Sequence, residues 1–215
     1  MTDPAGSAHV AEAQDHATAA SNELPQIYAP SQIDGTVPLR QGELLSNVIQ
    51  FRLDLEALKR DEGLATPVEH PLAIVLTQDC DCEQDFSCRV EGKVSALVPS
   101  ILLCEVHNAA DELGPGNAAG INSKIRTRIV INKDERYHFL QEIPAEFDAE
   151  NAGLPELVLD FKRCFTVPTD ELYFRIDKGE TKRRTRLLSP YLEHFSSRFG
   201  YFSLRVALPL DHASQ

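Results

Sequence analysis

The apolar positions of the chain fall into several short runs and one helical stripe. Near-continuous apolar runs rich in β-branched side chains are typical of strands that are buried on both faces. Runs of this kind predict strands over residues 42–49, 71–77, 98–106, 137–143 and 157–167. The first of these runs is entered through Gly42, and the last ends at Pro168.

Helical spacing is clearest near the C-terminus. A stripe of bulky apolar side chains at steps of three and four predicts an amphipathic helix that packs on the core. We expect Ser189 to cap this helix, Pro190 to occupy its first position and Pro209 to end it. The stripe consists of Leu192, Phe195, Phe199, Phe202 and Val206.

Shorter helical signals occur at three other places. Phe51, Leu55 and Leu58 have helical spacing and indicate a short helix or a long loop within residues 51–64. A short helix is expected after Asn122, and Thr169 is expected to cap a helical turn. The acidic segment 78–95 contains cysteines and is expected to be a loop.

The N-terminal part of the chain differs from the rest. Residues 1–24 are rich in alanine and polar side chains without an apolar stripe, which predicts a disordered tail. Residues 25–41 contain three prolines and a glycine, and are expected to be an extended approach to the core. The sequence therefore predicts a tail and approach over 1–40, followed by a single domain over 41–215.

Composition restricts the protein class. The 215 residues are 42% hydrophobic and 25% charged, which supports a globular core. No apolar run approaches the roughly 18 residues that cross a bilayer, and no secretory signal is visible. Five cysteines, an odd number, without an export signal favour reduced thiols and a cytoplasmic location.

The charge is strongly acidic but uneven. A formal net charge of −12 opposes binding of nucleic acid by the protein as a whole, because such binding depends on Lys and Arg. Residues 121–140 and 162–186 are nevertheless basic islands, and they either pair internally or form local anion-binding or RNA-binding patches. The candidate contacts are Lys124, Arg126, Arg128, Lys133, Arg136, Arg183, Arg184 and, on the final helix, Arg198.

Three of the expected strands resemble a known family in their order. Gln41-Gly42-Glu43-Leu44-Leu45, His70-Pro71-Leu72-Ala73-Ile74-Val75-Leu76-Thr77 and Ile101-Leu102-Leu103-Cys104-Glu105-Val106-His107 are similar to strands of the MazF/PemK-like toxins. The similarity covers residues 41–110. It implies an α+β fold with an SH3-like small β-barrel, here extended at its C-terminus by the amphipathic helix. It also implies an endoribonuclease activity, and a homodimer as one alternative for the assembly.

The chain departs from that family at the residues that serve RNA cleavage. The family's arginine before the proline and threonine after the later strand are replaced by His70 and His107. The loss of both groups favours a module without catalytic activity. Two imidazoles near one rim of the barrel would still supply an acid and a base, so a metal-independent endoribonuclease remains an alternative. A solvent-exposed loop is the plain alternative for each histidine.

The cysteines suggest a third alternative. Zinc binds four thiolate or imidazole ligands in a tetrahedron, and the candidate set is Cys80, Cys82, Cys88 and His107. The spacing of these cysteines is not a common zinc spacing. No cofactor is therefore expected, with a zinc-stabilised interaction domain left open. Motifs for nucleotide binding and for zinc proteases are absent from the sequence.

The leading hypothesis is a non-catalytic binding or regulatory module of a bacterial toxin–antitoxin or phage-defence system. It depends on the lost catalytic pair, the net acidity and the large extension beyond the barrel. A protein is the expected partner, RNA is an alternative through the basic islands, and no membrane contact is expected.

Overall fold

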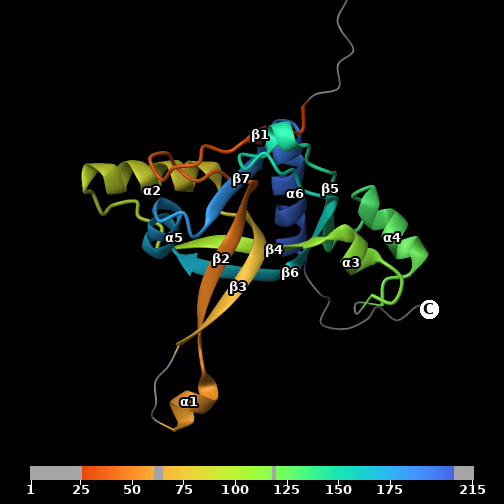
Figure 1. The fold of residues 1–215 in the computed structure, drawn as a ribbon, viewed down its shortest axis with the longest axis horizontal. Helices are drawn as coiled ribbons and strands as arrows, with labels where there is room; N and C mark the ends of the chain where they lie inside the picture. Colours follow the sequence, from red (N-terminus) through yellow and green to blue (C-terminus); the bar gives the residue numbers. More distant parts are fainter. Residues whose placement is uncertain (1–25, 61–64, 118–119, 206–215) are drawn as a thin grey trace, which may run out of the picture.

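The computed structural model describes residues 26–60, 65–117 and 120–205, which form an α+β fold built on one antiparallel sheet (Figure 1). The strand order is β1-β7-β2-β3-β4-β6-β5. The strands are β1 (Tyr28–Pro30), β2 (Glu43–Leu53), β3 (Ala65–Val75), β4 (Ser100–Asn108), β5 (Tyr137–Leu140), β6 (Leu157–Pro168) and β7 (Lys182–Leu187).

The three strands that carry the family resemblance are neighbours in this sheet. Leu44 pairs with Ile74, and Ile74 pairs with Cys104 on its other side. The three apolar runs within residues 41–110 therefore lie edge to edge, as β2, β3 and β4. The run 157–167 is likewise observed as β6, which pairs with β4 and β5.

The sheet is open, so the closed SH3-like barrel expected from the resemblance is not confirmed. In the described residues, β1 pairs only with β7 and β5 pairs only with β6. A side-chain bond links the two edges instead, because the Tyr28 hydroxyl donates to the carbonyl of Gln141 at 3.0 Å. Phe195 of the final helix belongs to the same core cluster as Tyr28 and Leu140 from the two edge strands.

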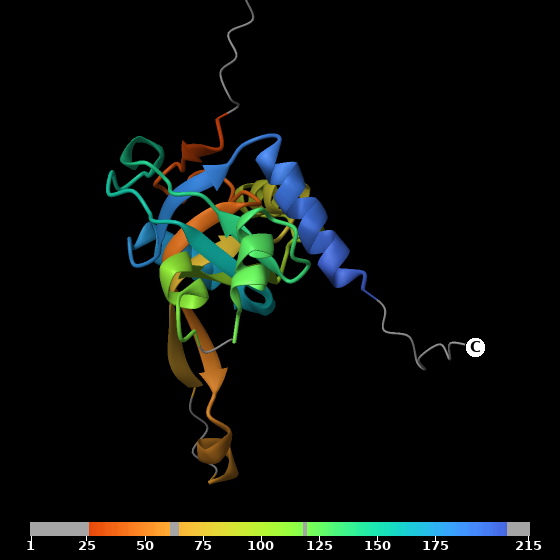
Figure 2. The ribbon, with the colours of Figure 1, turned by 90° about the vertical axis from the view of Figure 1, so that its right-hand side faces the viewer.

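Helices cover both faces of the sheet and one end of it. Side chains of α2 and α5 join the core with Leu45 and Leu103, whereas α6 joins the core with Leu44 and Cys104 on the opposite face. Helices α3 and α4 pack on β5 and β6 (Figure 2). The helices are α1 (Leu55–Lys59), α2 (Asp79–Glu91), α3 (Ala109–Leu113), α4 (Ser123–Val130), α5 (Thr169–Asp177) and α6 (Tyr191–Ser203), with a 3-10 turn, η1 (Ala145–Phe147).

The final helix agrees with its predicted stripe, but its start does not agree with the predicted cap. Phe195 is fully buried, and Leu192, Phe199 and Phe202 pack against the same core. The helix begins at Tyr191 without a side-chain cap, so the capping role expected for Ser189 is wrong. Val206 and Pro209 lie outside the described residues.

Three further segments differ from the sequence predictions. The expected loop at 78–95 contains helix α2, whose first turn carries Asp79 and Asp81 and whose C-terminal cap, Gly92, has a left-handed φ of 67°. Residues 25–41, expected to be an extended approach without an element, contain strand β1. The predicted disordered tail, residues 1–24, lies outside the described residues. Thr169 is the first residue of α5, and its hydroxyl donates to the carbonyl of Val98 instead of capping the helix.

Candidate functional site

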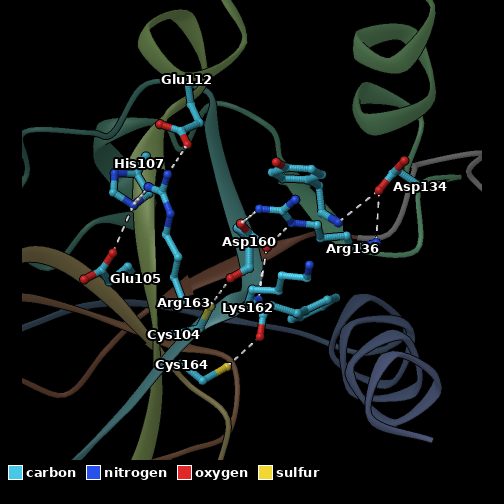
Figure 3. Close-up of polar contacts among 12 residues, drawn as sticks. Cys104, Glu105, His107, Glu112, Asp134, Arg136, Asp160, Lys162, Arg163 and Cys164 are labelled. Carbon is cyan, nitrogen blue, oxygen red and sulfur yellow. Dashed lines mark hydrogen bonds and ion pairs between the residues drawn. The ribbon is translucent and has the colours of Figure 1, made fainter. Parts of the chain in front are cut away.

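The two histidines predicted as an acid–base pair lie against the same carboxylate, that of Glu105. His70 lies on β3, and Glu105 and His107 lie two residues apart on the neighbouring β4. The Nδ1 atom of His70 is 2.9 Å from Oε1 of Glu105. The Nε2 atom of His107 is 3.4 Å from Oε2 of the same carboxylate (Figure 3). Antiparallel pairing of β3 and β4 thus brings together two residues that are separated by 37 positions, and places a carboxylate between them.

His70 is held inside the protein. Its side chain is 2% exposed and stacks on Phe165, with ring centroids 3.7 Å apart and an interplanar angle of 12°. Burial lowers the pKa of His70, although the neighbouring Glu105 opposes this effect. The neutral ring donates its single N–H from Nδ1 to Glu105, which leaves Nε2 as a buried acceptor without a hydrogen-bond partner.

His107 is half-buried, and the lone pair on its Nε2 atom accepts a hydrogen bond. Its Nε2 atom lies 2.8 Å from a terminal nitrogen of Arg163 on β6, and a guanidinium can only donate. Nε2 therefore accepts, and the ring proton is on Nδ1. The other terminal nitrogen of Arg163 donates to Glu112 of α3 at 2.7 Å, as Figure 3 shows.

This network connects β3, β4, β6 and α3, and with both imidazoles neutral it contains two carboxylates, Glu105 and Glu112, and one guanidinium, Arg163. Acid–base catalysis would require each imidazole to reach a proton of the substrate within hydrogen-bond distance. His70 is shielded by Phe165, and His107 directs its basic nitrogen at Arg163. In this arrangement the network serves to hold the strands and α3 together.

The first basic island partly converges on a pocket. Lys124, Arg126 and Arg128 are exposed on α4, and Lys133 is exposed in the turn that follows. Arg136 precedes β5, donates to both oxygens of Asp160 at 2.8 and 2.5 Å, and lies over the Tyr137 ring (Figure 3). A pocket of about 400 Å³ is lined by Gly120, Ile121, Ile125, Arg128, Asp134, Glu135, Arg136, Tyr137 and Arg205. The two acidic residues of this lining weaken its attraction for anions.

The second basic island is used inside the fold. Residues 182–187 form strand β7, which was not predicted because four of its six side chains are basic. Arg183 donates to both carboxylate oxygens of the buried Glu43, and Arg184 donates to both oxygens of the buried Asp148. The expected contacts of Arg183 and Arg184 with anions or RNA do not fit this geometry, because internal carboxylates already bind both guanidinium groups.

Arg198 also has a structural role. It extends from α6 to the loop before β5, where it donates to the carbonyl oxygens of Asn132, Asp134 and Tyr137. Its Nε atom lies 3.1 Å from Nδ1 of the buried His138. Arg198 therefore fastens the 132–138 segment to α6 and is not presented to a ligand.

The structure does not assemble the candidate zinc ligands. Cys80 is exposed on α2, Cys82 is buried against the sheet and Cys88 is half-buried. Burial and the neighbouring Asp79 raise the pKa of Cys82 to about 12, which opposes thiolate formation. Over residues 26–60, 65–117 and 120–205, no cluster of three or more His, Cys, Asp or Glu side chains could hold a metal ion.

Strands β2 and β3 continue beyond the sheet as an arm, which the sequence did not predict. Their pairing extends to Leu53 and Ala65, whereas β4 pairs with β3 only over Ala73–Val75. Helix α1 lies at the tip of this arm (Figures 1 and 2), where Asp54 caps it by accepting from the N–H groups of Glu56 and Ala57. We call residues 51–60 and 65–67 the hairpin arm.

The hairpin arm carries a concentration of exposed apolar side chains. Four large apolar residues within eight positions are between 47% and 67% exposed, namely Phe51, Leu53, Leu55 and Leu58. From sequence, the helical spacing of Phe51, Leu55 and Leu58 indicated a short helix or a long loop within residues 51–64, and helix α1 lies within that range. In the structure Phe51 lies on a strand, with the guanidinium of Arg175 over its ring. Among the described residues none of the four apolar side chains joins a core cluster, because the arm projects away from the sheet (Figure 1).

Comparison with known proteins identifies no relative: neither a family model, nor a curated protein, nor a solved structure matches the chain. None of the helices in the described residues has the length and apolar character needed to span a bilayer.

Proposed function

We propose that the chain is a non-catalytic binding or regulatory module that docks a protein partner through the hairpin arm. The observation that carries this proposal is the cluster of exposed apolar side chains on a projecting two-stranded arm. Exposed apolar patches of this kind mark protein–protein contacts, because burial against a partner removes them from water. The resemblance to MazF/PemK-like toxins is the reason for proposing a toxin–antitoxin or phage-defence setting.

The net charge indicates what the partner is like. A formal charge of −12 repels a second copy of the chain and attracts a basic protein. The arm itself mixes signs, with Arg52, Lys59 and Arg60 beside Asp54 and Glu56, so its apolar side chains meet no strong local field. The charge of the whole molecule is the basis for proposing a basic partner, with an apolar groove that receives α1 and the end of β2. A homodimer is an alternative outcome.

The histidine network supports the absence of catalysis. His70 is buried under Phe165, and the lone pair of His107 is bonded to Arg163. The buried ion pairs of Arg183 and Arg184 remove two of the cations that an RNA-cleaving enzyme would use to hold its substrate. No observation in the described residues supports the zinc-stabilised alternative.

The test is an affinity pull-down that compares the wild-type chain with two matched variants. The chain is immobilised and exposed to native lysate, and bound proteins are quantified for wild type, for Leu53→Ser/Leu55→Ser/Leu58→Ser and for the control Val90→Ser/Val94→Ser. The control removes apolar side chains on and after α2 that are even more exposed than those of the arm. We expect one basic protein whose recovery falls at least about tenfold with the arm variant, remains with the control and decreases in salt. Equal recovery from both variants contradicts the proposal.

A second candidate is the metal-independent endoribonuclease, favoured by one observation. His70 and His107 both contact Glu105, so the two imidazoles lie in one cluster. If the chain cleaves RNA, His70→Ala and His107→Ala each reduce the rate by about 100-fold or more, as expected for a general acid or base. Cleavage that persists in both variants excludes this pair, and loss of cleavage in both overturns the non-catalytic proposal.

A further inference from the structure

A polar pocket lies beside β1 and β7, away from the hairpin arm and from the histidine network. Its volume of about 380 Å³ is within the range of small-molecule sites. The end of β1, the segment that leads into β2 and the outer part of β7 form its walls. The lining residues are Pro30, Ser31, Gln32, Val37, Pro38, Arg40, Glu43, Arg183 and Arg186.

Arg186 brings an uncompensated cation to this pocket. It lies on β7 between Ala29 of β1 and Glu43 of β2. Within the part of the chain that the structure describes, its guanidinium has no ion pair and no hydrogen bond. Its planar fork of N–H donors suits a carboxylate or a phosphate, each of which accepts two parallel bonds.

The other charges of the pocket are already balanced. All five N–H groups of Arg183 are used, by Glu43 and by the carbonyl oxygens of the approach segment. Both oxygens of Glu43 are engaged by Arg183, and one also accepts from the backbone N–H of Arg40. The side chain of Arg40 turns to Asp79 at 3.1 Å. The carboxylate of Glu43 therefore does not neutralise Arg186.

Ser31 provides a second, independent indication of a ligand. Its side chain is 94% buried, as its exposed fraction is 6%, and its hydroxyl has no hydrogen-bond partner. A buried hydroxyl without a partner destabilises the fold, so its presence at a pocket wall calls for a function. The hydroxyl oxygen is itself fully buried, so the Ser31 side chain would turn about χ1 to donate to a ligand oxygen in the pocket.

We propose that this pocket binds the oxyanion of a small molecule, either a phosphate or a carboxylate. Arg186 supplies the charge, Ser31 donates from the wall and the exposed amide of Gln32 lies at the rim. The pocket is separate from the arm, so the proposal holds whether or not the arm binds a protein.

The test is a pair of NMR titrations of the full chain at constant ionic strength, the first with inorganic phosphate and the second with malonate. We expect saturable shifts of the Ser31, Gln32 and Arg186 amides with the favoured anion. Arg186→Gln weakens its affinity at least about tenfold, equivalent to ~1.4 kcal/mol. The exposed α4 residue Arg126 gives the control Arg126→Gln, which leaves the affinity unchanged.

Ser31→Ala separates binding from folding. Because the hydroxyl has no partner in the fold, its removal leaves the melting temperature unchanged or raised while it weakens anion binding. Shifts that fail to saturate with both anions overturn the proposal. An equal loss of affinity in Arg126→Gln and Arg186→Gln also overturns it, because it indicates general screening.

Discussion

Arg183 and Glu43 are 140 residues apart in sequence and form a two-point ion pair in which both side chains are at most 2% exposed. The pair joins β7 to the first residue of β2. Three carbonyl oxygens of residues 34–38 accept the remaining guanidinium protons, so the approach segment is held by the same side chain. This arrangement explains why a strongly charged stretch of sequence forms an internal strand.

The first prediction concerns that buried pair. Glu43→Gln leaves the Arg183 charge buried without its counter-charge, and should reduce the free energy of unfolding by about 3–5 kcal/mol. Lys182→Ala removes the exposed pair with Glu150 on the same strand, and should cost about 1 kcal/mol or less. Urea denaturation measures both. A similar loss of unfolding free energy in the two variants would show that the buried pair contributes no more to stability than the exposed pair.

A second prediction concerns pH. Burial, reinforced by the positive charges of Arg198 and His194, lowers the pKa of His138 from 6.5 to about 3. The unfolded chain therefore binds a proton at higher pH than the folded chain does, so His138 contributes stability above pH 6.5 that is lost as the pH falls toward 3. His138→Gln should flatten the dependence of the urea midpoint on pH in this window. An NMR titration in which the His138 ring protonates near pH 6.5 would contradict this account.

Much of the sheet could be predicted from sequence because its central strands are apolar on both faces. Leu44, Ile74 and Leu103 lie in runs whose composition suits a buried strand, and their three strands are neighbours in the sheet. Strand β7 was not predictable in this way, since its arginines are internal only because Glu43 and Asp148 come from distant parts of the chain. Helix α2 was missed because few of its residues are apolar, although Cys82 and Asp85 are buried.

The candidate site was predicted only in part. The sequence singled out His70 and His107, but it did not identify Glu105 or Arg163 as their partners. The i, i+2 spacing of Glu105 and His107 on one strand face was the available signal. The exposure of Leu55 and Leu58 could not be read from periodicity, because a stripe does not reveal whether a core lies beneath it.

A third prediction concerns two cysteines. Cys104 and Cys164 are direct partners across β4 and β6, at a position where antiparallel Cα atoms lie about 4.5–5.5 Å apart and a disulfide spans about 4.4–6.8 Å. The hydrogen bond from Cys104 lowers the pKa of Cys164, so hydrogen peroxide should oxidise Cys164 to the sulfenic acid with release of one water. The Cys104 thiol then displaces a second water to close the disulfide, which should raise the stability by roughly 2–4 kcal/mol. Peptide mass mapping should find the 104–164 link and the loss of two hydrogens.

The control for this prediction is Cys104→Ser, which should abolish the link while leaving the exposed Cys80 open to alkylation. Oxidation that reaches Cys80 but leaves Cys104 and Cys164 as free thiols would refute the pairing.

The central claim, that the hairpin arm is the docking surface, is tested most directly by site-specific photo-crosslinking in living cells. A photoreactive residue is placed at Leu55 on the arm or at Val94, which is also exposed but follows α2. The account predicts that position 55 crosslinks to one basic protein and that position 94 does not. Crosslinking to the same protein from both positions, or from position 94 alone, would contradict it, as would the absence of any crosslink from position 55.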